Sequence, residues 1–514
     1  TGVEWLKGFC SHTSAQSSMR LSTLCAAGTY ASECIEAGTF QPGVSYFPEE
    51  KRVTFSGADA QTSAALVGIH YGTHFKVVTS KQSQEQYVLT QCGAPQPNAS
   101  DVDALVPLTG NWTRKFFDIP LKSPLTTTTA ALTFFETLQV EDRVLLAPPF
   151  ATGACWQRAH ACNASLEDGW SGNATLRQSQ LDAADAVFMD CTSARDGNCA
   201  NVVSRANAVQ YSGTNEAGLL AAAEHIKFFA AFFNKEVEAA SAFEDTVAHF
   251  NAAAPSSAQT KPVVAWVSYQ GWPDRFVLAD AAYRRSIVEA AGGLPADGSD
   301  FHQTIAGWTE VEAVSGVPSS GKTYSLALSS FNTSENCPSA CSLAQLKTLA
   351  AAAFKPVLQS ADVLIDETYE QNPNNYNLDS FKATFETDDL KALTNLNILR
   401  IDGTIAADNG LDWYESRFAR PEWAVEGLAF QLFPDSGNGK RYFRNIAKDE
   451  TPVVITPQMC GVTMVACTGA DPVAIAMLGP AAAIPTATPD DASSVAHEAS
   501  WSLVALAVVF YAVQ

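Results

Sequence analysis

The chain has 514 residues, of which 46% are hydrophobic, so it can bury more than one core and two domains are expected. Its 54 acidic side chains outnumber the 32 basic ones and give a formal net charge of −22. This charge argues against nucleic acid as a partner, because binding to a polyphosphate depends on Lys and Arg.

Residues 1–60 form a Cys- and Ser-rich N-terminal segment in which no element is predicted. A first α/β lobe is expected over 61–213. It opens at 74–93 with HFKVVTSKQSQEQYVLTQCG, where two alternating stretches flank a polar turn, a pattern typical of a hairpin. The apolar runs FFDIPL, RVLLAPP and AVFMD follow, and each leads into a turn and a helical pattern.

Residues 214–254 carry two consecutive helical patterns that are expected to connect the lobes. In the first pattern, apolar side chains recur every three or four positions, at Leu219, Ala223, Ile226 and Phe229. Asn234 is a favourable N-cap, and it precedes a second apolar stripe at Val237, Ala240, Val247 and Phe250.

A second α/β lobe is expected over 262–450, where PVVAWVSY, VLIDE and NILRID repeat the alternation of short apolar runs with helical patterns. The predicted fold is therefore α/β, with two Rossmann-like lobes of mainly parallel sheets joined by a long helical linker. Ligands bind to such sheets beyond the carboxyl ends of the strands, so a cleft between the lobes is the expected site.

Residues 451–478 are expected to form a disulfide hairpin, and 479–514 a linker followed by a hydrophobic anchor signal. The final apolar run, WSLVALAVVFYAV, is shorter than the roughly 20 residues that span a bilayer. Small residues, a brief polar spacer and an apolar end are typical of a lipid-anchor signal. A packed terminal helix and a short tail anchor are the alternatives.

The twelve cysteines include four closely spaced pairs, which predict short loops closed by disulfides. These pairs are Cys155/Cys162, Cys191/Cys199, Cys337/Cys341 and Cys460/Cys467. A zinc site is the weaker alternative, because the spacings fit no zinc ribbon and the eight His form no cluster.

Five N-x-[ST] acceptors, together with the cysteines, favour the secretory pathway and a position at the cell surface. They are Asn98, Asn111, Asn163, Asn173 and Asn332. The chain starts without Met or an apolar leader, as expected after removal of a signal peptide.

The stretch GVPSSGKT at 316–323 matches the phosphate-loop pattern G-x-x-x-x-G-K-[ST]. That loop needs a buried strand before it and a helix after it. Upstream WTEVEAVS gives no buried strand, and downstream YSLALSSF alternates like a strand. We therefore expect a surface loop that binds no ATP.

No G-x-S-x-G elbow and no activated nucleophile is recognisable, so an enzyme is not expected, nor is a catalytic cofactor or metal. Aromatic side chains instead mark the predicted post-strand loops, where large apolar rings favour ligand binding. The predicted ligand-binding residues are Trp170, Tyr269, Trp272, Phe276, Trp308, Asp412, Trp413 and Arg417.

The order of these segments over about 66–443 resembles the bacterial substrate-binding proteins that serve importers of vitamin B12, siderophores and haem. The resemblance is carried by the hairpin with FFDIPLKSPLTTTTAALTFFETLQVEDRVLLAPP, and then by KPVVAWVSYQGW, FKPVLQSADVLIDE and PEWAVEGLAF. It implies two lobes that close over a ligand without covalent chemistry.

Local likeness is greatest to the B12-binding branch. WSGNATLRQSQLDAADAVFMD, AGWTEV and DWYESR are similar to its ligand-contacting segments, which implies roles for Trp170, Trp308, Asp412 and Arg417. The family's importer-docking Glu corresponds to Leu176, so docking to a bacterial-type permease is not implied. With the secretory features, the chain resembles algal cobalamin acquisition proteins, which implies cobalamin as ligand and an uptake receptor or transporter as partner.

Two other hypotheses remain open. A binding protein for haem or an iron-siderophore would share the fold. An adhesion or structural glycoprotein would leave the loop tryptophans without a small ligand.

Overall fold

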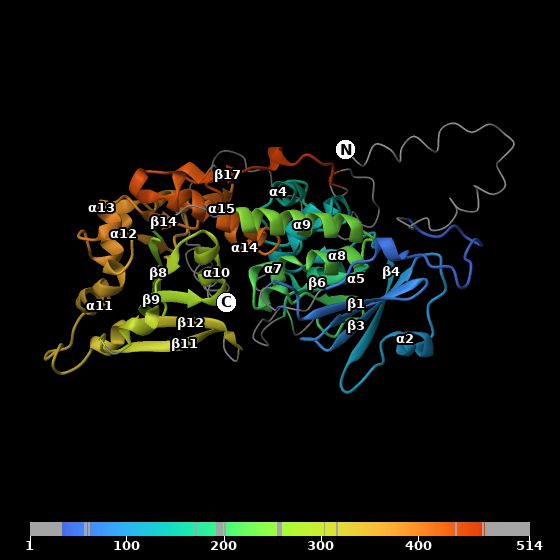
Figure 1. The fold of residues 1–514 in the computed structure, drawn as a ribbon, viewed down its shortest axis with the longest axis horizontal. Helices are drawn as coiled ribbons and strands as arrows, with labels where there is room; N and C mark the ends of the chain where they lie inside the picture. Colours follow the sequence, from blue (N-terminus) through green and yellow to red (C-terminus); the bar gives the residue numbers. More distant parts are fainter. Residues whose placement is uncertain are drawn as a thin grey trace, which may run out of the picture.

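A computed structural model describes residues 33–55, 59, 62–169, 172–191, 199, 202–253, 260–302, 304–314, 317–436, 439–464 and 467. Two α/β lobes lie side by side, with the first lobe in blue to green and the second in yellow to orange (Figure 1). The predicted α/β class with two lobes is confirmed. Each lobe contains a group of parallel strands; antiparallel strands extend this group on both sides in the second lobe and belong to a separate sheet in the first.

The first lobe begins with a sheet of order β1-β2-β3-β4. Its strands are β1 (Val67–Tyr71), β2 (Phe75–Ser80), β3 (Glu85–Gln91) and β4 (Thr113–Ile119), with η1 (Glu49–Lys51) before them and α2 (Ala99–Leu105) between β3 and β4. The predicted hairpin is confirmed, because β2 and β3 pair antiparallel.

A second sheet of the first lobe is wholly parallel, in the order β5-β6-β7. Its strands are β5 (Leu125–Thr126), β6 (Val187–Met189) and β7 (Ala208–Gln210). Between β5 and β6 lie η2 (Thr129–Ala131), α3 (Leu132–Thr137), η3 (Glu141–Arg143), α4 (Ala154–Ala161) and α5 (Ala174–Ala183). Phenylalanines from α3, β6 and α8 (Ile226–Ala231) pack ring against ring between these elements and form much of this core.

Helices connect the lobes as predicted: η4 (Gly213–Asn215), α7 (Leu219–Ala223), α8 (Ile226–Ala231) and α9 (Glu236–Ala252). Helix α9 packs against α8 of the first lobe and α15 (Pro421–Leu432) of the second. Two details of the prediction are wrong. Asn234 is not the N-cap of α9. It adopts a left-handed conformation (φ 55°), and its side chain bonds Lys76 and Gln91 instead of the start of the helix. Val237 is 41% exposed, so the buried face is displaced to Ala239 and Thr246.

The second lobe contains an eight-stranded sheet of order β11-β12-β9-β8-β13-β14-β16, with β10 beside β8. The strands are β8 (Val263–Gly271), β9 (Asp274–Ala281), β10 (Leu294–Pro295), β11 (Trp308–Val314), β12 (Val317–Ala327), β13 (Val363–Asp366), β14 (Ile398–Arg400) and β16 (Arg444–Asn445). A separate parallel pair joins β15 (Thr404–Ala406) to β17 (Val453–Ile455).

Helices cover both faces of this sheet and fill the space between the lobes. The α-helices are α10 (Ala282–Ala290), α11 (Leu343–Gln359), α12 (Leu378–Phe385), α13 (Lys391–Thr394), α14 (Trp413–Ser416) and α15 (Pro421–Leu432). The 3-10 turns are η5 (Gly298–Phe301), η6 (Leu328–Phe331), η7 (Pro373–Asn375), η8 (Pro434–Ser436), η9 (Ile446–Lys448) and η10 (Pro457–Met459). Figure 1 places α11 at the outer end of the lobe, and α10 and α14 on the side of the first lobe.

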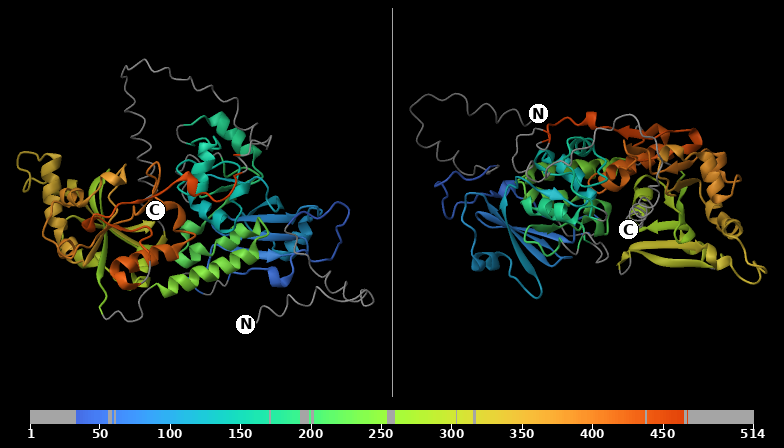
Figure 2. Two further views of the ribbon diagram at one scale, coloured as in Figure 1. Left: turned by 90° about the horizontal axis from the view of Figure 1, so that it is seen from above. Right: turned by 180° about the vertical axis from the view of Figure 1, so that it is seen from behind.

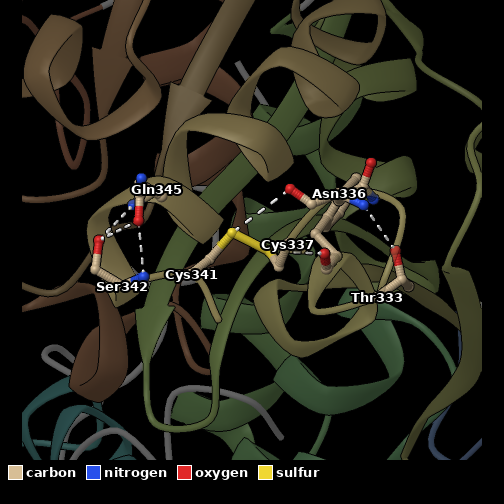
Figure 3. Close-up of a disulfide and its surroundings, with 7 residues drawn as sticks. Thr333, Asn336, Cys337, Cys341, Ser342 and Gln345 are labelled. Carbon is tan, nitrogen blue, oxygen red and sulfur yellow. Dashed lines mark hydrogen bonds between the residues drawn. A yellow bond between two sulfur atoms is a disulfide. The ribbon is translucent and has the colours of Figure 1, made fainter. Parts of the chain in front are cut away.

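Helix α11 begins at a capping box that adjoins a disulfide (Figure 3). The Ser342 hydroxyl accepts from the Gln345 backbone N–H, and the Gln345 side chain accepts from the Ser342 backbone N–H. Cys337 and Cys341 are disulfide-bonded just before this box, as the close spacing predicts. The local pair Cys191–Cys199 is confirmed as well.

Two other disulfides overturn the predicted local pairing. Cys155 bonds Cys460 and Cys162 bonds Cys467, each with a sequence separation of 305. Seven positions along a helix correspond to about 10 Å, whereas a disulfide needs Cα atoms roughly 4.4–6.8 Å apart. Cys155 and Cys162 lie along α4 and therefore cannot bond each other. A fifth disulfide joins Cys34 to Cys92.

We call residues 444–467 the C-terminal strap. It starts in β16 of the second lobe, pairs with the lobe again at β17, and then reaches α4 of the first lobe through η10. Met464 and the Cys155–Cys460 disulfide are buried in the first-lobe core. The strap and α9 are therefore two connections between the lobes, and both views in Figure 2 show the strap crossing from one lobe to the other.

Removing one strap disulfide is expected to cost little stability, because the other still closes a loop of the same length. Removing both, in a variant with Ala at Cys155, Cys162, Cys460 and Cys467, should cost about 2–4 kcal/mol of unfolding free energy. Urea denaturation of the single-pair and double-pair variants measures this difference. Equal and additive losses from the two pairs would contradict it, and a variant lacking Cys337–Cys341, with a separation of 4, is the short-loop control.

Candidate functional site

Polar and aromatic side chains meet where the central parallel strands of both lobes end. Tyr211 follows β7 and Asp190 follows β6 in the first lobe, and Glu367 follows β13 in the second. Figure 1 shows helices α10 and α14 on the side of the second lobe that faces the first lobe. We call this group, together with Tyr283, Arg284, Tyr414 and Arg417, the interlobe cluster.

A buried ion pair lies on the second-lobe side of the interlobe cluster. Arg284 Nη2 donates to Glu367 Oε2 at 2.7 Å, and the guanidinium lies over the rings of Tyr283 and Trp266. Burial lowers the pKa of Arg284, but the attraction of Glu367 outweighs it and the net shift is upward. The arginine is therefore charged, and it fixes α10 against the end of β13.

Arg417, at the end of α14, is a second buried cation, and it lies against aromatic rings rather than a carboxylate. It is 6% exposed, and its guanidinium lies 4.6 Å from the Tyr283 ring centre and 4.3 Å from that of Phe418. No carboxylate in the described part of the chain forms an ion pair with it, and its Nε has no hydrogen-bond partner there. This cation retains unused donor capacity.

Tyr211 contributes from the first lobe. It is buried against Phe134 and Phe229, and its hydroxyl has no partner among the described residues. Burial, reinforced by the negative charges of Asp190 and Glu216, raises the pKa of Tyr211 well above its ordinary value, and nearby Arg417 opposes this shift. The phenol is therefore a neutral hydrogen-bond donor that faces the second-lobe cation.

The interlobe cluster suits binding better than covalent chemistry. It offers aromatic faces, a cation whose Nε–H has no partner among the described residues, and phenolic hydroxyls, which hold an amphiphilic ligand by stacking and hydrogen bonding. Among the described residues, no group of three or more His, Cys, Asp or Glu side chains is arranged to hold a metal ion.

The structure separates the predicted ligand-binding residues into two groups, and Trp170 lies outside the described residues. The first group lies in the second-lobe core rather than in post-strand loops. Phe276 in β9 has no exposed surface, and Trp308 in β11 is stacked on Tyr324 and donates its Nε1–H to the Gly298 carbonyl. The segment predicted as a strand and loop is a β8–β9 hairpin, which turns these aromatics inward.

Trp272 is the exception in this group, because it is 72% exposed at the β8–β9 turn. Tyr269, in the same hairpin, packs on Phe276 and lies under Lys347 of α11. The Tyr269 backbone N–H also donates to the hydroxyl of Thr368, the residue after Glu367, at 3.0 Å, so this hairpin is anchored beside the end of β13.

The second group, Asp412, Trp413 and Arg417, lies on or beside α14 at the lobe boundary. Trp413 is fully buried against Trp266 and Phe443. Asp412 accepts from Thr152 Oγ1 of the first lobe at 3.1 Å and from Ser416 Oγ at 2.7 Å, so both of its oxygens have protein partners. The assignment of all eight residues as ligand contacts stays a prediction.

Sequence reasoning missed Tyr211, Tyr283, Arg284 and Glu367. Tyr283 and Arg284 interrupt the apolar run ADAAYRRSIV directly after a strand, and this polar interruption was the available signal. The sequence around Tyr211 contains no such signal, because the role of Tyr211 depends on Arg417, which is distant along the chain.

The phosphate-loop pattern lies in strand β12 instead of a surface loop. Residues 321–327 pair with β9, and 322–326 with β11, so their backbone N–H groups serve the sheet. Lys322 Nζ pairs with Glu310 at 2.9 Å. The prediction of a loop is wrong, and the strand–loop–helix arrangement that cradles phosphates is not formed here.

No protein-family model and no curated protein matches the chain. Solved structures with a similar arrangement include three bacterial haem-binding proteins. HutB of Vibrio cholerae is 11% identical over 61% of this chain and 99% of its own, with a TM-score of 0.41. A periplasmic protein from Pseudomonas aeruginosa is 10% identical over 65% and 99% (TM-score 0.39), and RhuT from Roseiflexus sp. RS-1 is 13% identical over 60% and 99% (TM-score 0.35). Identities and TM-scores this low say nothing about ligand or activity.

Replacing Arg284 with Met should destabilise the second lobe by about 3 kcal/mol, because it leaves Glu367 buried without a partner. The double variant with Glu367→Gln should lose less than the sum of the two single variants. Urea denaturation of the four proteins gives this coupling. Lys322→Met, which breaks the more exposed pair with Glu310, should cost roughly 1 kcal/mol or less and is the matched control. Additive losses would show that the two side chains do not act as a pair.

Proposed function

We propose that the protein is a non-catalytic solute-binding protein that holds its ligand between the two lobes, at the interlobe cluster. The observation that carries this proposal is Arg417, a buried guanidinium whose Nε–H has no partner among the described residues, at the place where strand ends of both lobes meet. Burying a cation without an anion is costly, so such a group is expected where a ligand supplies the missing acceptors.

We propose cobalamin as that ligand. A corrinoid is a large disk with apolar faces and an amide-rich rim. The faces suit Tyr283 and Phe418, and the amide oxygens suit the donors of Arg417 and Tyr211. The likeness of DWYESR to the B12-binding branch supports the same choice.

Haem or an iron-siderophore is the alternative, and the charge of Arg417 favours it. A guanidinium binds a carboxylate more strongly than an amide, because both partners are then charged. A ligand with carboxylates would therefore gain more from Arg417 than cobalamin does.

The proposed location is the outer face of a cell, after passage through the secretory pathway. Five disulfides between described residues fit an oxidising compartment, and all five predicted glycosylation asparagines are exposed. None of the helices in the described part of the chain has the length and apolar character needed to span a bilayer. The predicted anchor run at 501–513 lies outside the described residues.

Calorimetric titration of the purified protein with cobalamin, haem and ferric siderophores should give one class that binds at micromolar concentration or tighter. Arg417→Met should weaken that ligand tenfold or more, since a hydrogen bond to a charged group contributes about 1.5–3 kcal/mol. Trp170→Ala tests the first-lobe contact implied by resemblance.

The matched control is Arg275→Met, because the side-chain partner of Arg275 is Gln270 of the same hairpin rather than a member of the interlobe cluster. Failure of all three ligand classes to bind the wild type would refute the function. Binding with equal affinity in the wild type and Arg417→Met would refute the site alone. Trp308→Ala is unsuitable as a site test, because Trp308 packs in the core.

A chain that ends at Asp490 should be secreted into the medium, whereas the full chain should sediment with membranes. The reason is that only the full chain keeps the apolar run at 501–513. Fractionation of cells expressing both forms measures this. A truncated form that stays with the membrane would place the anchor elsewhere in the chain.

A further inference from the structure

The two lobes meet at the N-terminus of α4, where side chains from α14 bind the first lobe. Glu415 accepts two backbone N–H groups there, from Thr152 at 2.6 Å and from Gly153, the N-cap of α4, at 2.9 Å. Asp412 accepts from the Thr152 hydroxyl. Helix α14 also packs against η2 and α3 of the first lobe.

A third carboxylate comes from the first lobe itself. A methyl group placed on Gly153 would lie 2.6 Å from Glu136 Oε1 and 3.1 Å from Glu415 Oε1. The two carboxylates therefore approach Gly153 from opposite lobes, and only a residue without a side chain leaves room for them. We call Glu136, Asp412 and Glu415 the acidic triad.

Within the part of the chain that the structure describes, the acidic triad has no balancing cation. Among the described residues, no Lys, Arg or His forms an ion pair with any of the three. The groups that face it are Glu141 from η3, Trp156 from α4, and Tyr442, which is reached through the Ser416 hydroxyl. Arg417, at the end of α14, lies against aromatic rings instead.

Burial raises the pKa of all three carboxyl groups, and repulsion from other carboxylates adds to this shift for Glu136 and Glu415. Burial, then Asp412 and Glu141, raise the pKa of Glu136 from 4.5 to about 8. Burial, then Asp412 and Glu136, raise the pKa of Glu415 well above its ordinary value, and burial raises the pKa of Asp412 although Ser416 and Thr152 donate to it. Carboxylates this close titrate as one coupled unit.

We propose that the acidic triad is a pH-sensitive latch between the lobes: protons held among its carboxylates keep α14 on the N-terminus of α4, and their loss releases it. This regulation goes beyond ligand binding and does not depend on which ligand is bound. The latch controls access to the interlobe cluster, because Arg417 lies at the end of the same helix.

The direction of the pH effect follows from the raised pKa values. A carboxyl group that is harder to ionise in the closed contact than in water favours closure while it is protonated. Closure is therefore most favourable below the ordinary carboxyl pKa of 4.5, and it weakens as the pH rises through about 8. The latch closes in mild acid and opens in mild alkali.

Small-angle X-ray scattering of the full, disulfide-bonded chain between pH 5 and 9 tests the latch. The radius of gyration of the wild type should increase with rising pH. Glu136→Gln removes one ionisable member without changing its shape, so the midpoint of this increase should move up by at least about one pH unit. Glu244→Gln, at an exposed position of α9, should behave like the wild type.

A wild type whose dimensions do not change over this range, or that opens in acid, would overturn the latch. So would a Glu136→Gln curve that coincides with the wild type. Gly153→Ala provides a second route, since its methyl group displaces the carboxylates at every pH. This variant should be open at pH 6 and should expose the amides of 152–156 to hydrogen exchange; a compact, protected variant would contradict the proposal.

Discussion

The contact between Glu415 and the first turn of α4 fixes the relation of the two lobes. Backbone N–H groups at a helix start have no partner within the helix, so acceptor oxygens from elsewhere must satisfy them. Here helix and carboxylate belong to different lobes. Closure of the lobes thereby satisfies donors that would otherwise need water, and it places Arg417 opposite Tyr211.

A second buried charge organises the first lobe. Lys76 in β2 is fully buried, where it pairs with Glu236 and donates to the Asn234 side chain at 2.7 Å and to the Ala231 carbonyl at 3.0 Å. Such a pair contributes less to stability than an apolar contact of the same size, because both charges lose water. It does define where α8 ends and α9 begins, since these partners surround that turn. The connecting helix thus starts from a fixed point on the first sheet.

Local patterns in the sequence predicted the elements whose environment is simple. The β2–β3 hairpin and the helices from Leu219 to Ala252 follow from alternation and helical spacing. Nearby Gly and Pro residues predict loops at Trp308 and Phe276, but both residues lie in paired strands with their rings in the second-lobe core. Asp412 and Arg417 were found at the lobe boundary through resemblance, whereas Tyr211 and Arg284 are defined by contacts between distant segments. Spacing alone also predicts that Cys155 bonds Cys162, because it does not show that one helix holds the two cysteines too far apart.

The bonds from Cys155 to Cys460 and from Cys162 to Cys467 turn most of the protein into a covalent ring. A protease that cuts one peptide bond inside this ring opens it without producing two molecules. The cleaved chain keeps its mass, and its ends stay near each other at a high effective concentration. Damage in an exposed loop of the second lobe therefore leaves both lobes attached, and separation of the fragments needs a reductant or a second cut.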